Sequence, residues 1–157
     1  MPLDPSGDHD KSDFPVPTTV ALIGAPTDVG AGTRGASMGP EAMRVADLAG
    51  ALTGQGLTVI DHGNLQGPPN PGAPITDGYR HLAEVIEWNR AIHDAVHAEL
   101  AADRLPIFLG GDHSLAIGSI SAVARYCRAR GQTLRILWLD AHADFNTSEI
   151  TPSGNVH

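Results

Sequence analysis

Cysteine and aromatic residues are scarce in this sequence. The single cysteine, Cys127, excludes an intrachain disulfide and fits a reducing cytoplasm. Aromatic residues are only 4% of the 157, so Ala, Val, Leu and Ile must build the core. No apolar run is long enough to span a bilayer, and the acidic N-terminus lacks the apolar segment of a signal peptide. A net charge of −8 disfavours nucleic acid or an anionic membrane as a partner.

Apolar runs alternate with helical patterns along the chain, which predicts an α/β fold: a three-layer parallel sheet flanked by helices. Residues 1–17 are polar and proline-rich, and we expect a disordered tail there, followed by one domain over 18–157. The glycine-rich stretch after the first expected strand lacks the spacing of a dinucleotide-binding loop. The periodicity predicts strands at 18–25, 57–61, 105–109 and 134–139, and helices at 40–53, 79–100 and 115–130.

Three potential metal ligands follow the last expected strand: Asp140, His142 and Asp144. If the backbone stays extended there, its period of two points all three side chains to one side. Open α/β sheets place their sites at the carboxyl ends of strands, which is where these residues lie. The alternative is an Asp-rich turn with no ligand. We favour a metal site, because two carboxylates and an imidazole lie within five residues.

His113 emerges from the glycine pair of GGDHS (110–114), at the carboxyl end of the third expected strand. A lone histidine in a turn is usually structural, but here it has a matching partner site on the fourth strand. Ser114 is expected to cap the helix that follows. The pair His93 and His97 resembles a zinc-peptidase helix, but packing on an apolar stripe explains it better.

Carboxylates mixed with imidazoles, without thiolates, suit Mn²⁺ or a similar divalent ion. Asp140 and Asp144 have enough oxygens to bridge two ions, with His113 and His142 each binding one. Such a pair generates a nucleophilic hydroxide at neutral pH. The residues therefore predict metal-assisted hydrolysis and leave the substrate open.

Three motifs in order, GGDHS (110–114), DAHADFN (140–146) and SGNVH (153–157), resemble the ureohydrolases, the manganese family of arginases and agmatinases. The glycine-rich segment 24–44 is also similar to the N-terminal region of that family. The resemblance covers nearly everything from Thr18 onward and implies an arginase/deacetylase-like fold. It also implies that two Mn²⁺ ions are bound, and that the ligands are His113, Asp140, His142 and Asp144.

By the same resemblance, Asn146, Ser153 and Asn155 correspond to the loop that grips the α-carboxylate of arginine, although turn chemistry alone also accounts for such residues. His157 matches the family histidine assigned to proton transfer. The implied reaction is attack of hydroxide on the guanidinium carbon of L-arginine, which releases urea and L-ornithine.

Ureohydrolases carry a later D-x-D motif with further aspartate ligands, which this sequence does not contain. In the family, the last two strands also lie between the third and fourth strands. We therefore expect the N-terminal portion of a ureohydrolase domain, incomplete at its C-terminus and inactive by itself. The alternatives are an agmatinase or another ureohydrolase, or a truncated, non-catalytic metal-binding remnant. The complete protein is expected to be a cytoplasmic homo-oligomer, a trimer or a hexamer.

Overall fold

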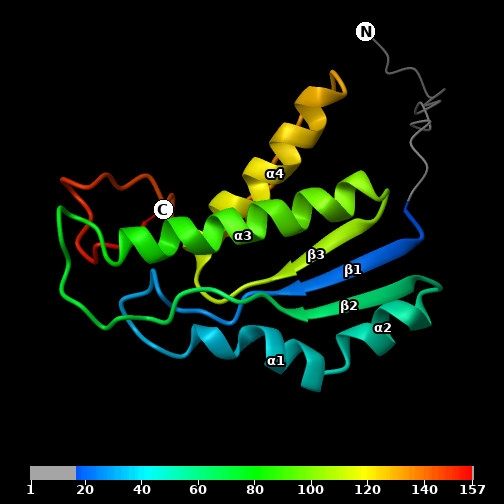
Figure 1. Ribbon diagram of the computed structural model, residues 1–157, viewed down its shortest axis with the longest axis horizontal. Coiled ribbons are helices and arrows are strands. Elements are labelled where there is room, and N and C mark those ends of the chain that lie inside the picture. The colour runs from blue at the N-terminus through cyan, green and yellow to red at the C-terminus, as the bar shows by residue number, and fades with distance from the viewer. Residues whose placement is uncertain (1–16, 157) are drawn as a thin grey trace, which may run out of the picture.

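A parallel sheet between two layers of helices forms the body of the protein, for which a computed structural model describes residues 17–156 (Figure 1). The strands lie in the order β2-β1-β3, and both neighbours pair with β1 in parallel. Helices α1 and α2 cover one face, and α3 and α4 cover the other. The strands are β1 (Thr19–Gly24), β2 (Thr58–Asn64) and β3 (Leu105–Leu109). The helices are α1 (Gly39–Val45), α2 (Leu48–Gly54), α3 (Leu82–Ala101) and α4 (Ala116–Ala129), with 3-10 turns η1 (Ala36–Met38) and η2 (His113–Leu115).

The three-layer α/β architecture predicted from the sequence is thus confirmed. The boundary between a tail at 1–17 and a domain at 18–157 stays a prediction, because residues 1–16 lie outside the described part of the chain. None of the described helices is long and apolar enough to cross a membrane.

Strand β1 is the centre of the core. Residues 20–23 of this strand are at most 1% exposed. This burial arises because β1 has a strand on each side and a helical layer on each face. The apolar side of α3, which includes Val85, Ile92 and Val96, belongs to this core.

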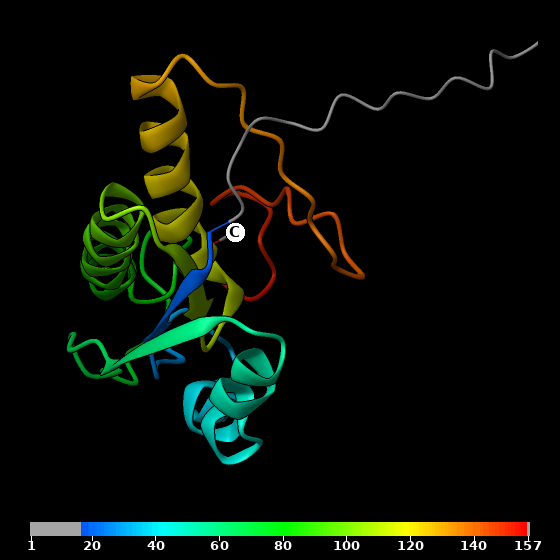
Figure 2. The same ribbon diagram turned by 90° about the vertical axis from the view of Figure 1, so that its right-hand side faces the viewer.

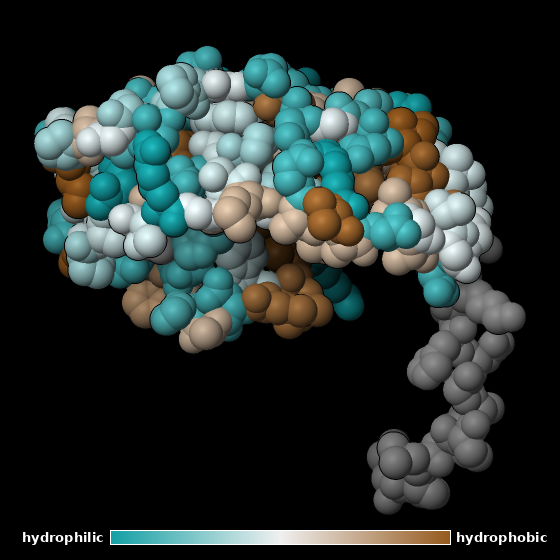
Figure 3. All heavy atoms as spheres, turned by 90° about the horizontal axis from the view of Figure 1, so that it is seen from below, coloured by the Kyte–Doolittle hydropathy of each residue, from teal (hydrophilic) through white to brown (hydrophobic). Residues whose placement is uncertain are grey.

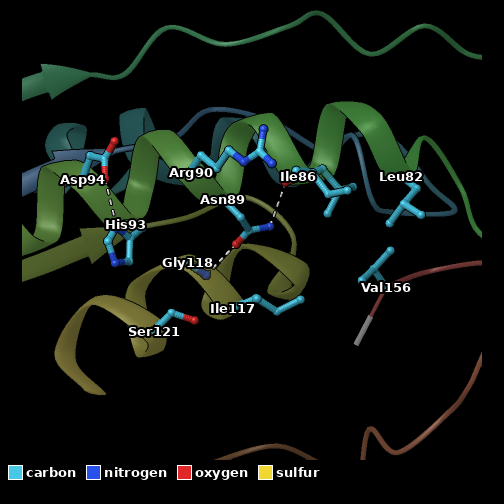
Figure 4. A pocket seen from close by; sticks show the side chains of 11 residues that line it. Leu82, Ile86, Asn89, Arg90, His93, Asp94, Ile117, Gly118, Ser121 and Val156 are labelled. Carbon is cyan, nitrogen blue, oxygen red and sulfur yellow. Dashed lines mark hydrogen bonds and ion pairs between the residues drawn. The ribbon is translucent and has the colours of Figure 1, made fainter. Parts of the chain in front are cut away.

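Helices α3 and α4 approach closely at Asn89 and Gly118 (Figure 4). The main-chain N–H of Gly118 donates to Oδ1 of Asn89 at 2.6 Å, while Nδ2 of Asn89 donates to the carbonyl of Val85 at 2.9 Å. The two helices flank a largely apolar pocket of about 440 Å³. On α3, the rings of His93 and His97 stack with centroids 6.0 Å apart.

The helix expected over 40–53 is two helices, because the chain turns at Asp47. Asp47 has a left-handed backbone (φ 59°), and its side chain accepts a hydrogen bond from the main-chain N–H of Gly50 at 3.1 Å. This cap begins α2 with a new axis, so the prediction of one continuous helix was wrong.

The strand expected at 134–139 is also wrong, since this segment has no regular structure and is largely exposed. Leu137 and Leu139 are 83% and 87% exposed. Figure 2 shows this orange segment running apart from the sheet. A strand needs a neighbour to satisfy its backbone, and within residues 17–156 no strand lies along the free edge of β3. Apolar side chains therefore reach the surface there, in addition to the apolar patches on the face shown in Figure 3.

Candidate metal centre

His113 is held in place by the turn that follows β3. The side chain of Asp112 accepts hydrogen bonds from the main-chain N–H groups of Ser114 at 3.1 Å and Gly30 at 3.0 Å. The buried hydroxyl of Ser114 also donates to Asp112. A side chain at Gly111 would collide with the carbonyl of Thr27, so the turn requires glycine there. Asp112 therefore caps the 3-10 turn η2, whereas α4 begins after Leu115 without a side-chain cap. The expectation that Ser114 caps the helix was wrong.

Three of the four expected metal ligands converge: His113, Asp140 and Asp144. Their ligand atoms lie within 4.8 Å of one another. Nδ1 of His113 is 3.8 Å from Oδ2 of Asp140 and 3.8 Å from Oδ2 of Asp144. Two carboxylates and one imidazole at this separation fit a divalent cation that favours oxygen and nitrogen ligands.

Asp140 is kept ionised by its surroundings. The main-chain N–H of His142 donates to Oδ1 of Asp140 at 2.9 Å, and this hydrogen bond is the largest influence on the carboxyl group. Together with the nearby His113 and His142 rings, it lowers the pKa of Asp140 against a smaller opposing effect of desolvation. A carboxylate at this position is thus available to a cation at neutral pH.

His142 is not part of the converging group. Its side chain is 83% exposed, although its Nδ1 lies 3.5 Å from Oδ1 of Asp140. The chain bends at 141–142, and Asp144 has a left-handed backbone (φ 50°), so the condition of an extended backbone is not met. The period-two argument therefore does not apply here, and Asp140 and Asp144 meet at His113 without it. The assignment of His142 as a ligand stays a prediction.

The expected substrate residues lie partly beside this group. A pocket of about 450 Å³ is lined by His113, His142 and Asp144 and also by Asn146 and Ser153. Asn155 does not line it, but its main-chain N–H donates to Oγ of Ser153 at 3.2 Å. His157, the expected proton-transfer residue, lies outside the described residues.

Sequence reasoning missed Asp28, which organises the glycine-rich loop after β1. Burial tends to raise the pKa of this carboxyl group, but hydrogen bonds from Gly35, Asn70 and Ser37 outweigh it and lower the pKa. The main-chain N–H of Gly35 donates at 2.9 Å and Nδ2 of Asn70 at 3.1 Å. An aspartate just before a glycine-rich stretch is the signal that could have indicated this role.

Comparison with known proteins gives one family. A sequence model of the arginase family matches residues 18–157. The arginase of Brucella melitensis is 40% identical over 139 residues, which are 87% of this chain and 44% of that protein. The native structure of arginase from Bacillus caldovelox has a TM-score of 0.75 at 36% identity, over 88% of this chain and 46% of that one.

A crystal structure of Entamoeba histolytica arginase in complex with L-ornithine has a TM-score of 0.73 at 28% identity, over 89% of this chain and 46% of that one. The chain therefore spans a little under half the length of the relatives it matches and contains part of their fold.

Proposed function

The chain belongs to the arginase family, and from this membership we propose that it is the metal-binding portion of a binuclear manganese hydrolase that converts L-arginine to L-ornithine and urea. The observation that carries the proposal is the convergence of His113, Asp140 and Asp144. Two of these residues, His113 and Asp144, line a pocket that Asn146 and Ser153 also line.

Each ligand has a definite part in this proposal. His113, Asp140 and Asp144 would hold Mn²⁺, and His142, whose Nδ1 lies 3.5 Å from Oδ1 of Asp140, would be a further ligand. Bound ions of this kind lower the pKa of water so that it attacks at neutral pH. The lowered pKa of Asp140 favours its charged form, and the hydrogen bond from Ser114 to Asp112 fixes the turn from which His113 projects.

Substrate recognition is assigned to the polar side of the same pocket. Asn146, Ser153 and Asn155 would hold the α-carboxylate of arginine, so that the guanidinium carbon lies over the metal ligands. The complex of Entamoeba histolytica arginase with L-ornithine supports an amino-acid product. We assign to His157 the protonation of the departing amine, a role for which the near-neutral pKa of histidine is suited.

A carboxylate grip distinguishes arginine from agmatine, which has no carboxylate. An agmatinase or another ureohydrolase is therefore the second candidate, and a non-catalytic metal-binding remnant is the third. For the complete enzyme we propose a trimer or hexamer in the cytoplasm that acts on a small molecule. The lone Cys127 fits a reducing cytoplasm, and the net charge of −8 disfavours nucleic acid or an anionic membrane as a partner.

Urea release tests the proposal. The 157-residue chain with Mn²⁺ and L-arginine should release little or no urea, because it lacks the D-x-D aspartates of the family pattern. The natural gene product should release urea from arginine faster than from agmatine, and a His113→Ala version should lose this activity. Robust turnover by the 157-residue chain would contradict the need for further ligands. A natural product that prefers agmatine would support the agmatinase alternative.

A further inference from the structure

A tight turn before α3 lies against the segment that carries the proposed substrate residues. Thr76 and Tyr79 exchange two main-chain hydrogen bonds of 3.0 Å, and Gly78 between them has φ +81°. We name residues 75–80 the clamp turn and residues 148–155 the substrate loop. In Figure 1 the green stretch before α3 and the red stretch after residue 147 lie together, and a hydrogen bond from Arg80 to Ser153 joins them.

Arg80 binds the main chain of the substrate loop at two successive residues. Its main-chain N–H donates to the carbonyl of Gly154 at 2.7 Å, and its Nη2 donates to the carbonyl of Ser153 at 3.0 Å. Both acceptors are backbone oxygens, so Arg80 fixes the path of the loop whichever side chains the loop carries. A hydrogen bond from a guanidinium is charge-assisted and therefore stronger than a neutral one.

Glycines make this close approach possible on both sides. A side chain at Gly78 would collide with the carbonyl of Ser148, and a side chain at Gly154 would lie 2.8 Å from Cδ1 of Ile75. Gly154 is also buried and has φ +73°. The clamp turn and the substrate loop therefore pack closely at Gly78 and at Gly154, in addition to the hydrogen bonds of Arg80.

The clamp turn is itself anchored in the interior. His81, which follows Arg80, is buried, and its Nδ1 lies 2.7 Å from the carbonyl of Val29, while its Nε2 lies 3.0 Å from the carbonyl of Ala73. The carbonyl of His81 accepts from the N–H of Val85 in the first turn of α3. The contacts of His81 therefore hold the neighbouring Arg80 in place at the start of α3.

We propose that Arg80 is a positioning residue that holds the backbone of Ser153 and Gly154, so that Ser153 and Asn155 face the substrate beside the metal ligands. The proposal rests on the proposed arginine-hydrolase function for its meaning in catalysis. Arg80 acts through the loop, since its hydrogen bonds go to the loop backbone. Its loss should therefore weaken recognition of the carboxylate and leave metal binding intact.

Hydrogen exchange in the 157-residue chain tests whether Arg80 holds the backbone of the substrate loop. The Arg80→Met variant keeps an apolar stem and the main-chain hydrogen bond to Gly154, and it removes the guanidinium donor to Ser153. The N–H of Asn155, which donates to Oγ of Ser153, is the reporter. We expect this amide to exchange about tenfold faster than in the parent, the effect of losing one hydrogen bond. Arg80→Lys should recover part of the protection. The matched control is Arg90→Met, at an exposed arginine of α3, and it should leave Asn155 unchanged.

Unchanged exchange at Asn155 in Arg80→Met would overturn the proposal. If that variant unfolds, seen as fast exchange throughout β1, the comparison is made with Arg80→Lys. Exchange at Asn155 equally fast in Arg80→Lys and Arg90→Met would then overturn the proposal, and faster exchange in Arg80→Lys alone would support it.

Ligand affinity tests whether Arg80 supports recognition of the substrate carboxylate. In the natural gene product with Mn²⁺ present, Arg80→Met should bind L-arginine about five- to tenfold more weakly and agmatine within about twofold of the parent. Equal losses for both ligands would overturn a role through the carboxylate loop. A parent that binds no arginine would contradict the proposed function, and the exchange of Asn155 would still decide whether Arg80 holds the loop.

Discussion

Nδ1 of His113 lies 3.8 Å from Oδ2 of Asp140, although the two residues come from different turns of the chain. His113 is placed by the glycine turn after β3, and Asp140 by a segment that is not part of the sheet. The two parts of the candidate metal site therefore meet without the strand pairing expected between their segments.

Glu99 should contribute to stability in a pH-dependent way. This largely buried carboxylate on α3 accepts from Nε of Arg104 at 2.6 Å and lies 3.2 Å from Nε2 of His62 on β2. The hydrogen bond from Arg104 is the main reason that the pKa of Glu99 is lowered from its ordinary value of 4.5. We expect Glu99→Gln to lower the free energy of unfolding by about 1–3 kcal/mol at pH 7.

The sign of the pH dependence follows from the lowered pKa. The stabilisation by Glu99 is complete above the unfolded-state value of 4.5 and is lost as pH falls through the lower folded-state pKa. Urea unfolding at several pH values should show the difference between Glu99→Gln and parent shrinking in acid. Glu87→Gln, at an exposed position on α3, is the control and should match the parent. A difference that grows in acid would contradict this assignment.

Gly118 should resist substitution because α3 and α4 touch at this point. A Cβ there would lie 3.0 Å from Oδ1 of Asn89 and closer still to the carbonyl oxygen of Asn89. Gly118→Ala should therefore destabilise the protein by about 1–3 kcal/mol in thermal or urea unfolding. Gly54→Ala on α2 has open space around it and should be neutral or stabilising by up to about 1 kcal/mol. Equal effects at both sites would argue against close packing at Gly118.

The exposed segment 134–139 should tolerate charge. Leu139 is 87% exposed, so Leu139→Lys should change the free energy of unfolding by less than about 0.5 kcal/mol and reduce aggregation. Leu115 is fully buried, and Leu115→Ala should cost about 2–5 kcal/mol. A large loss of stability in Leu139→Lys would mean that this segment is packed in solution, contrary to its exposure here.

Ser153 should act on substrate choice. If its hydroxyl and the adjacent amide of Asn155 hold a carboxylate, Ser153→Ala in the natural gene product should raise the KM for arginine more than that for agmatine. Steady-state kinetics with both substrates gives the comparison. Equal increases in the two KM values would argue against the carboxylate grip.

Local signals in the sequence predicted the three strands of the sheet and three of the residues that converge at the candidate metal site. The apolar runs near 19–24 and 105–109 form strands, because each finds a neighbour among the described residues. The run at 134–139 is also apolar and forms no strand, because strand formation depends on partners that a local pattern does not contain. Asp47 shows a further limit, because its left-handed backbone and cap interrupt an otherwise continuous helical pattern.

The expected metal ligands show the same division. His113, Asp140 and Asp144 were predictable from their place after apolar runs, and they converge. The position of His142 could not be predicted, because it depends on a bend at 141–142 and on the left-handed φ of Asp144. Arg80 could not be found from the sequence either, since its contacts join segments far apart in the chain.

Titration of the 157-residue chain with Mn²⁺ by calorimetry or electron paramagnetic resonance tests the metal centre most directly. The parent should bind Mn²⁺, and His113→Ala and Asp144→Ala should each weaken the affinity at least about 10- to 100-fold. His97→Ala, a substitution on α3 away from the group, should bind as the parent does. Equal Mn²⁺ affinity in His113→Ala, Asp144→Ala and parent would contradict the proposal that these residues form the metal site.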